Sequence, residues 1–180
     1  ISSMATEMGA IAILFPPSDE VLQYCASRSY SPIVPVYADP DAKYEQEFVF
    51  DMGLYTPVVS LPGQPHHVAD IKEVKGIKID SVFIGSCTNG RMEDMRETAR
   101  ILKGRRVAPG VVLKIVPATD DIWNTCLKEG LIDIFKSSGA LFGNAGCAGC
   151  ASGQIGQNGP GEKTVSTGNR NFEGKQGKGE

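Results

Sequence analysis

The fold is decided by residues 80–90, which read DSVFIGSCTNG. The apolar run that ends at Ile84 predicts a buried strand, because a strand covered on both faces is apolar without alternation. A polar loop bounded by Gly85 and Gly90 follows and carries Cys87. Residues 93–102 then repeat apolar side chains at helical spacing, so a helix is expected directly after the loop.

The same alternation continues towards the C-terminus. The expected elements are a strand at 111–116, helices at 121–129 and 131–137, and a short strand at 140–142. This order predicts an α/β fold, a parallel sheet with helices on both faces. Ligands bind beyond the carboxyl ends of the strands in such sheets. The Cys87 loop and the loop that follows residue 142 are therefore expected at the same sheet edge.

The first part of the chain gives less regular signals. We expect a helix at 4–9, a strand at 11–15, a helix from Ser18 or Asp19 to about Arg28, a proline-rich loop at 29–42, and strands at 45–49 and 56–61. The prolines and glycine of Pro62–Pro65 predict a turn. A domain boundary is expected there, dividing the chain into residues 1–65 and 66–180.

Composition excludes several classes of function. The 180 residues carry a net charge of −3, so the chain lacks the basic excess that binding to nucleic acid requires. The longest apolar run, Ala10–Pro17, is shorter than the ~20 residues of a membrane span, and no signal peptide is expected.

The sequence is expected to be a segment of a longer chain. Five widely spread cysteines favour the reducing cytoplasm over a secreted disulfide scaffold.

The motif Gly146–Cys150, which reads GCAGC, has several interpretations. A zinc site needs four ligands, and the only histidines, His66 and His67, are adjacent and expected at the surface. A thioredoxin-like redox pair usually opens a helix, which the surrounding glycines disfavour. Glycines instead favour a loop whose backbone approaches an inorganic cluster closely. Zinc and a buried structural pair remain as alternatives.

Three cysteines lie in glycine-bounded loops, namely Cys87, Cys147 and Cys150. Cys25 and Cys126 lie inside predicted helices and are expected in the core. An iron–sulfur cluster normally takes four thiolates. Three thiolates would leave one iron open to act as a Lewis acid on a substrate hydroxyl.

The last motif spans residues 166–175 and reads STGNRNFEGK. It places two cations, Arg170 and Lys175, among glycines. The guanidinium of an arginine presents a fork of donors that suits carboxylates. A solvated surface loop is the alternative interpretation.

Taken together, the motifs IGSCTNGR at 84–91, CAGC at 147–150 and NRNFEG at 169–174 resemble the aconitase superfamily. They are most similar to large subunits of the 3-isopropylmalate dehydratase or homoaconitase type, and the resemblance covers essentially the whole chain. It implies a cytoplasmic hydro-lyase that dehydrates and rehydrates a 2-hydroxy di- or tricarboxylic acid. Isopropylmalate of leucine biosynthesis is the first expected substrate. A homoaconitate or dimethylmalate dehydratase and a non-catalytic iron–sulfur sensor are the alternatives.

The resemblance also implies roles for single residues. It assigns a [4Fe-4S] cluster to Cys87, Cys147 and Cys150, a catalytic role beside the open iron to Glu7, and substrate binding to Asn169, Arg170 and Lys175. Two positions depart from the family pattern. Lys175 stands where the family has a second arginine, so the charge is kept but the fork is lost. Ser3 stands where the family commonly has asparagine.

The resemblance further implies a division of labour among domains. Residues 1–65 would be the C-terminal part of an α/β domain that carries Glu7, and residues 66–180 would be the α/β cluster-binding domain. An upstream domain and a swivelling domain or small subunit would supply the remaining acid–base residues. The chain by itself is therefore expected to be inactive. The expected partners are a small hydroxy acid and that small subunit or domain, with neither nucleic acid nor membrane.

Overall fold

The computed structural model describes residues 2–151, 153–169, 171–172 and 174–177, with the backbone alone for Ser3 and Glu7. The chain forms two compact units, Ile1–Tyr55 and Thr56–Glu180. The compact units divide earlier in the chain than the boundary expected after Pro65, because residues 56–65 pair within the second unit. The domain assignment by function remains a prediction.

The first unit contains four short helices and no strand among its described residues. These helices are η1 (Ser2–Met4), η2 (Thr6–Met8), α1 (Asp19–Ala26) and η3 (Met52–Leu54). The hydroxyl of Ser18 accepts a hydrogen bond from Val21 N at 3.4 Å, which caps α1 as predicted. The helix expected at 4–9 is present only as η2 and the end of η1.

Three predictions for the first unit are wrong. The strands expected at 11–15 and 45–49 do not form, because no strand of the described unit pairs with them. Most of their side chains remain exposed, with Ile11 104% and Val49 99% exposed. Cys25 is half-buried and not a core residue, since α1 has no buried residue.

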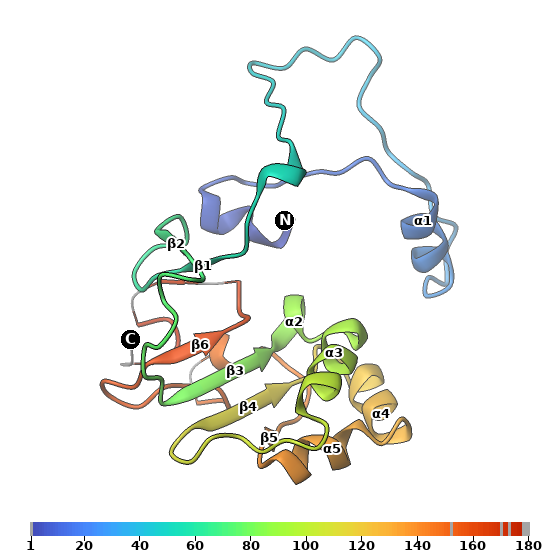
Figure 1. The fold of residues 1–180 in the computed structure, drawn as a ribbon. Helices are drawn as coiled ribbons and strands as arrows, with labels where there is room; N and C mark the ends of the chain where they lie inside the picture. Colours follow the sequence, from blue (N-terminus) through green and yellow to red (C-terminus); the bar gives the residue numbers. More distant parts are fainter. Residues whose placement is uncertain (1, 152, 170, 173, 178–180) are drawn as a thin grey trace. The chain divides into compact units, whose positions relative to one another are not determined.

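The second unit holds two sheets (Figure 1). Strands β1 (Val58–Ser60) and β2 (Val68–Asp70) pair antiparallel. The larger sheet has the order β5-β4-β3-β6, and all its pairings are parallel. Its strands are β3 (Ser81–Gly85), β4 (Val112–Val116), β5 (Leu141–Phe142) and β6 (Thr164–Ser166). The predicted α/β fold with a parallel sheet is confirmed.

Helices connect these strands. They are α2 (Ser86–Asn89), α3 (Met92–Leu102), α4 (Asp120–Lys128), α5 (Leu131–Ser138) and η4 (Ala148–Cys150). The helices and strands predicted between residues 80 and 142 are therefore confirmed, and their ends differ from the expected ones by only a few residues. The short elements β2, α2, η4 and β6 were not predicted, because three or four residues carry too little periodicity to be detected. No helix in the described part of the chain is long and apolar enough to cross a bilayer.

The two faces of the larger sheet are covered differently. One face carries Val82, Ile84, Leu113 and Ile115, which pack against buried side chains of α3, α4 and α5. At the centre of this core, Phe135 is fully buried and its ring stacks on Phe142 with centroids 5.4 Å apart.

The opposite face carries Phe83 and Val116, which pack against Ala148 of η4 and against Ile155. The loop that carries Cys147 and Cys150 is therefore held against the sheet by an apolar contact. Alternation along β3 explains this split, because successive side chains of a strand point to opposite faces.

Candidate functional site

The carboxyl ends of the parallel strands bring three sequence motifs to one edge of the sheet. Helix α2, with Cys87, follows β3 directly, and the turn with Cys147 and Cys150 comes after β5. Cα atoms of α2 and η4 approach within 8 Å of each other. The expectation that both cysteine loops lie at the same sheet edge is confirmed.

The Cys87 turn passes very close to β4. Gly85 has a φ of 134°, and a Cβ atom at this position would lie 1.9 Å from the carbonyl oxygen of Val116. A Cβ atom on Gly90 would lie 2.6 Å from the carbonyl oxygen of Ser86. Both positions therefore require glycine, and the sharp turn between them leaves the side chain of Cys87 exposed.

Two glutamines hold the second cysteine turn. The side-chain oxygen of Gln154 accepts a hydrogen bond from Ala148 N at 2.8 Å. The amide of Gln157 donates to the carbonyl oxygens of Gly149 at 2.6 Å and Ala151 at 3.3 Å. The buried Lys114 donates from Nζ to the Gln157 carbonyl at 2.9 Å and so fixes Gln157 to the sheet. These glutamines were not predicted, because glutamine in a glycine-rich stretch has no local signature.

We expect Gln157→Ala to loosen the Cys147–Cys150 turn. Two carbonyl oxygens lose their donor, so the free energy of unfolding should fall by about 1–2 kcal/mol. Urea denaturation measures this loss, and alkylation by iodoacetamide should accelerate at Cys150. The exposed Gln23 makes no side-chain bond to a described residue, so Gln23→Ala serves as the control and should change neither quantity. Equal alkylation rates in the two variants would contradict the role of Gln157.

The end of β6 joins the third motif to the same edge. Thr167 N donates to the carbonyl oxygen of Phe83 at 3.0 Å, and Gly85 N donates to the Thr167 hydroxyl at 3.1 Å. The side-chain amide of Asn89 donates to the carbonyl oxygen of Thr167. Residues that precede Asn169 are thus tied to both ends of the Cys87 turn.

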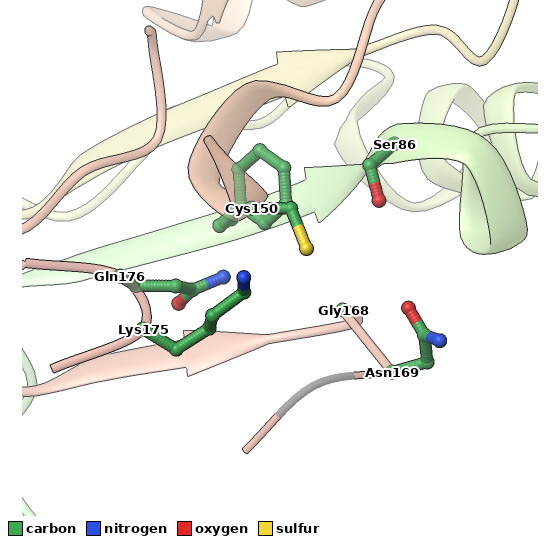
Figure 2. A pocket seen from close by; sticks show the side chains of 7 residues that line it. Ser86, Cys150, Gly168, Asn169, Lys175 and Gln176 are labelled. Atoms are coloured by element: carbon green, nitrogen blue, oxygen red, sulfur yellow. The ribbon is translucent and has the colours of Figure 1, made fainter. Parts of the chain in front are cut away.

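These segments enclose a small pocket in the second unit (Figure 2). It is lined by Phe83, Ser86, Cys150, Gly168, Asn169, Lys175 and Gln176. The structure therefore brings three of the predicted site residues together, Cys150, Asn169 and Lys175. Ser86 and Gln176 join them without having been predicted, because serine and glutamine carry no metal or charge signal in a sequence.

The pocket lining suits an anion. Its described residues include no carboxylate, and Lys175 supplies a positive charge that makes no ion pair with a described residue. Asn169, Gln176 and Ser86 add neutral hydrogen-bond donors. A ligand rich in acceptor oxygens is the chemical complement of such a lining.

The five cysteines fall into different environments, and all of them are free thiols. Cys126 is fully buried in the core, as predicted, and burial raises the pKa of its thiol to about 11. A thiol held protonated in this way is a poor metal ligand. Cys87 and Cys147 are exposed, and Cys150 is half-buried.

The thiols of Cys87, Cys147 and Cys150 lie on adjacent turns but are not gathered around one point. Within the part of the chain that the structure describes, no group of three or more His, Cys, Asp or Glu side chains is arranged to hold a metal ion. The donor set still fits a cluster, because three free thiols stand on two turns in contact. Glycine is required at position 149 of the second turn, because a Cβ atom there would lie 2.9 Å from the carbonyl oxygen of Gly156.

Four other residues singled out in the sequence have two different outcomes. The side chain of Glu7 and the whole of Arg170 lie outside the described residues, so their roles remain predictions. His66 and His67 are exposed in the turn between β1 and β2, as predicted. The side chain of Asn171, in contrast, anchors the third motif to this turn by donating to the carbonyl oxygen of Gln64 at 3.3 Å.

Comparisons with known proteins agree with one another. A model of the aconitase family (aconitate hydratase) matches residues 1–180. The 3-isopropylmalate dehydratase large subunit of Nitratidesulfovibrio vulgaris is 46% identical over 177 residues, which is 98% of this chain and 42% of that protein. The 3-isopropylmalate dehydratase large subunit 1 of Methanopyrus kandleri is 41% identical over the same shares of both chains. A probable methanogen homoaconitase large subunit of Methanosarcina mazei is 40% identical over 178 residues, 99% of this chain and 45% of that protein. The chain spans less than half the length of these relatives.

Proposed function

This chain belongs to the aconitase family, and we propose that it is the cluster-holding part of the large subunit of a hydro-lyase. The proposed reaction is the stereospecific dehydration and rehydration of isopropylmalate in leucine biosynthesis. The observation that carries the proposal is the pocket that joins Cys150 with Asn169 and Lys175 at the carboxyl edge of the sheet. The names of the relatives from N. vulgaris and M. kandleri support this substrate. The name of the M. mazei relative supports homoaconitate as the second candidate.

The proposed cofactor is a [4Fe-4S] cluster held by Cys87, Cys147 and Cys150. When bound, it would supply a Lewis-acidic iron that weakens the bond between carbon and the leaving hydroxyl. Support comes from the three free thiols on adjacent turns and from the glutamines that hold the second turn.

The proposed work of the chain's own residues is to bind and orient the hydroxy acid. The ammonium of Lys175 and the amide of Asn169 would hold a substrate carboxylate, together with the guanidinium of Arg170. Glu7 would hold the proton that leaves with the hydroxyl. A base outside these residues would remove the neighbouring C–H proton.

A small subunit or swivelling domain is the proposed partner, because the matched relatives are named large subunits. The reducing cytoplasm is the proposed location, in keeping with five free thiols. The whole assembly, and not this segment alone, would carry out turnover.

The substrate proposal is tested with the full-length large subunit, combined with its small subunit and reconstituted anaerobically with iron and sulfide. Dehydration of isopropylmalate, homocitrate and dimethylmalate is followed through the absorbance of the unsaturated products. We expect the highest kcat/KM for isopropylmalate. A higher kcat/KM for homocitrate would select the homoaconitase alternative, and no turnover of any of the three would contradict the proposal.

In the same assembly we expect Arg170→Lys to lower kcat/KM for the preferred substrate by about 10- to 100-fold. Lysine keeps the charge but loses one bond of a bidentate pair with a carboxylate. Arg105→Lys is the matched control, since Arg105 is exposed and makes no ion pair with a described residue. An unchanged kcat/KM in Arg170→Lys would refute the assignment of Arg170.

A further inference from the structure

Ser86 is a buried polar side chain with an unused hydroxyl. It is 3% exposed, and no hydrogen bond joins its hydroxyl to any residue that the structure describes. Buried hydroxyls are nearly always paired, because burial without a partner costs free energy. The other buried serine hydroxyls follow that rule. Ser81 bonds with Thr164, and Ser138 donates to the carbonyl oxygen of Phe135 at 2.7 Å.

The backbone of Ser86 is also unusual. Its φ is 66°, one of two positive φ values among the described non-glycine residues. A left-handed backbone costs a residue with a Cβ atom about 1–2 kcal/mol, and glycine would remove that cost. A functional role of the serine side chain, which glycine could not fill, would explain why this conformational free energy is tolerated at position 86.

The hydroxyl faces the pocket of the candidate site, whose volume of ≈10 Å³ has room for about one oxygen atom of a ligand. Ser86 lines the pocket together with Cys150, Asn169 and Lys175. Figure 2 shows the hydroxyl of Ser86, the thiol of Cys150 and the ammonium of Lys175 pointing toward the same space. The unused donor is therefore aimed into a pocket whose described lining carries a cation and no carboxylate.

We propose that Ser86 is a further ligand-binding residue, whose hydroxyl donates a hydrogen bond to an oxygen of the bound hydroxy acid. The inference rests on the proposed function and extends it, because it adds a neutral donor beside the charged contacts. In the ligand-free protein this hydroxyl has no hydrogen-bond partner among the described residues. In the complex it gains the partner that it lacks.

The test uses the full-length large subunit with Ser86→Ala and with Ser86→Gly, and 3-isopropylmalate and malonate as probes. Both variants lack the hydroxyl, but glycine also relieves the left-handed backbone. We expect Kd for 3-isopropylmalate to rise about tenfold in both variants. The Tm of the ligand-free protein should be unchanged or higher, since an unpaired buried hydroxyl is removed.

Ser138→Ala is the matched control, because Ser138 is equally buried but has a partner and lies outside the pocket. It should lower the Tm of the ligand-free protein and leave Kd unchanged. An unchanged Kd in both Ser86 variants, beside clear wild-type binding, would overturn this inference and leave the proposed function standing. Two further outcomes would overturn the inference. One is a fall in the Tm of ligand-free Ser86→Ala as large as that of Ser138→Ala, which would indicate a structural role. The other is a Ser86→Ala protein in which only the visible spectrum after reconstitution changes, which would indicate a role at the cluster. A wild-type protein that binds neither probe would overturn the inference and the substrate proposal together.

Discussion

Replacing Cys147 by serine is expected to abolish cluster binding, and with it the activity of the assembled enzyme. Serine keeps the size of the side chain but replaces a soft thiolate by a hydroxyl that iron binds weakly. After anaerobic reconstitution, the wild-type protein should hold about four irons and four sulfides per chain. It should also absorb in the visible region through charge transfer from thiolate to iron. The Cys147→Ser protein should show neither.

Cys25→Ser is the control for this loss. Cys25 is a free, half-buried thiol on α1, outside the turns that carry the proposed ligands. The Cys25→Ser protein should keep the iron, the sulfide and the visible absorbance. Retention of the cluster by Cys147→Ser would refute the proposed ligand set. Retention of zinc by the wild type in place of iron would favour the structural zinc alternative.

Gly85→Ala is expected to destabilise the second unit severely. The added Cβ would lie 1.9 Å from the carbonyl oxygen and 2.8 Å from the carbonyl carbon of Val116, at a φ of 134°. These are backbone atoms of the neighbouring strand, so no side chain can move aside to relieve the clash. The free energy of unfolding should fall by more than about 4 kcal/mol, which only severe substitutions reach.

Gly104→Ala separates the clash from the backbone cost. Gly104 also has a positive φ, 73°, but a Cβ there would meet no atom within 4 Å. Its expected cost is therefore only about 1–2 kcal/mol, that of a left-handed alanine. Urea denaturation of both variants gives the comparison. An equal fall in the free energy of unfolding for both variants would contradict the prediction, because the clash with β4 would then add nothing to the backbone cost.

The regular elements of the second unit could be predicted because their signals are local. Strands β3 and β4 are mostly apolar, and α3, α4 and α5 repeat apolar residues at helical spacing. The same reasoning failed at residues 11–15 and 45–49. Apolar residues are also common there, but a strand exists only when another strand supplies its hydrogen bonds. The described part of the first unit provides none.

The residues of the candidate site also fall into two groups, those that the sequence predicts and those that only the structure reveals. The thiol of a cysteine and the cation of a lysine or arginine indicate a possible ligand-binding role from residue type alone. The amino-acid sequence is therefore enough to propose Cys150 and Lys175 as site residues. It is not enough for Gln157 and Ser86, because an amide and a hydroxyl acquire a role only from what surrounds them. The bonds from Gln157 to Gly149 and Ala151, and the unpaired burial of Ser86, depend on the packing of distant segments.

The sequence by itself determined the α/β class, the order of strands and helices around the Cys87 loop, and the residue types available as ligands. These follow from periodicity and from side-chain chemistry, which are properties of neighbouring residues. Only the tertiary structure decided which residues share a pocket, which turn each glutamine holds, and which buried hydroxyl has no partner among the described residues. Those features arise between segments many residues apart, because parallel strand pairing and burial bring them together after the local elements have formed.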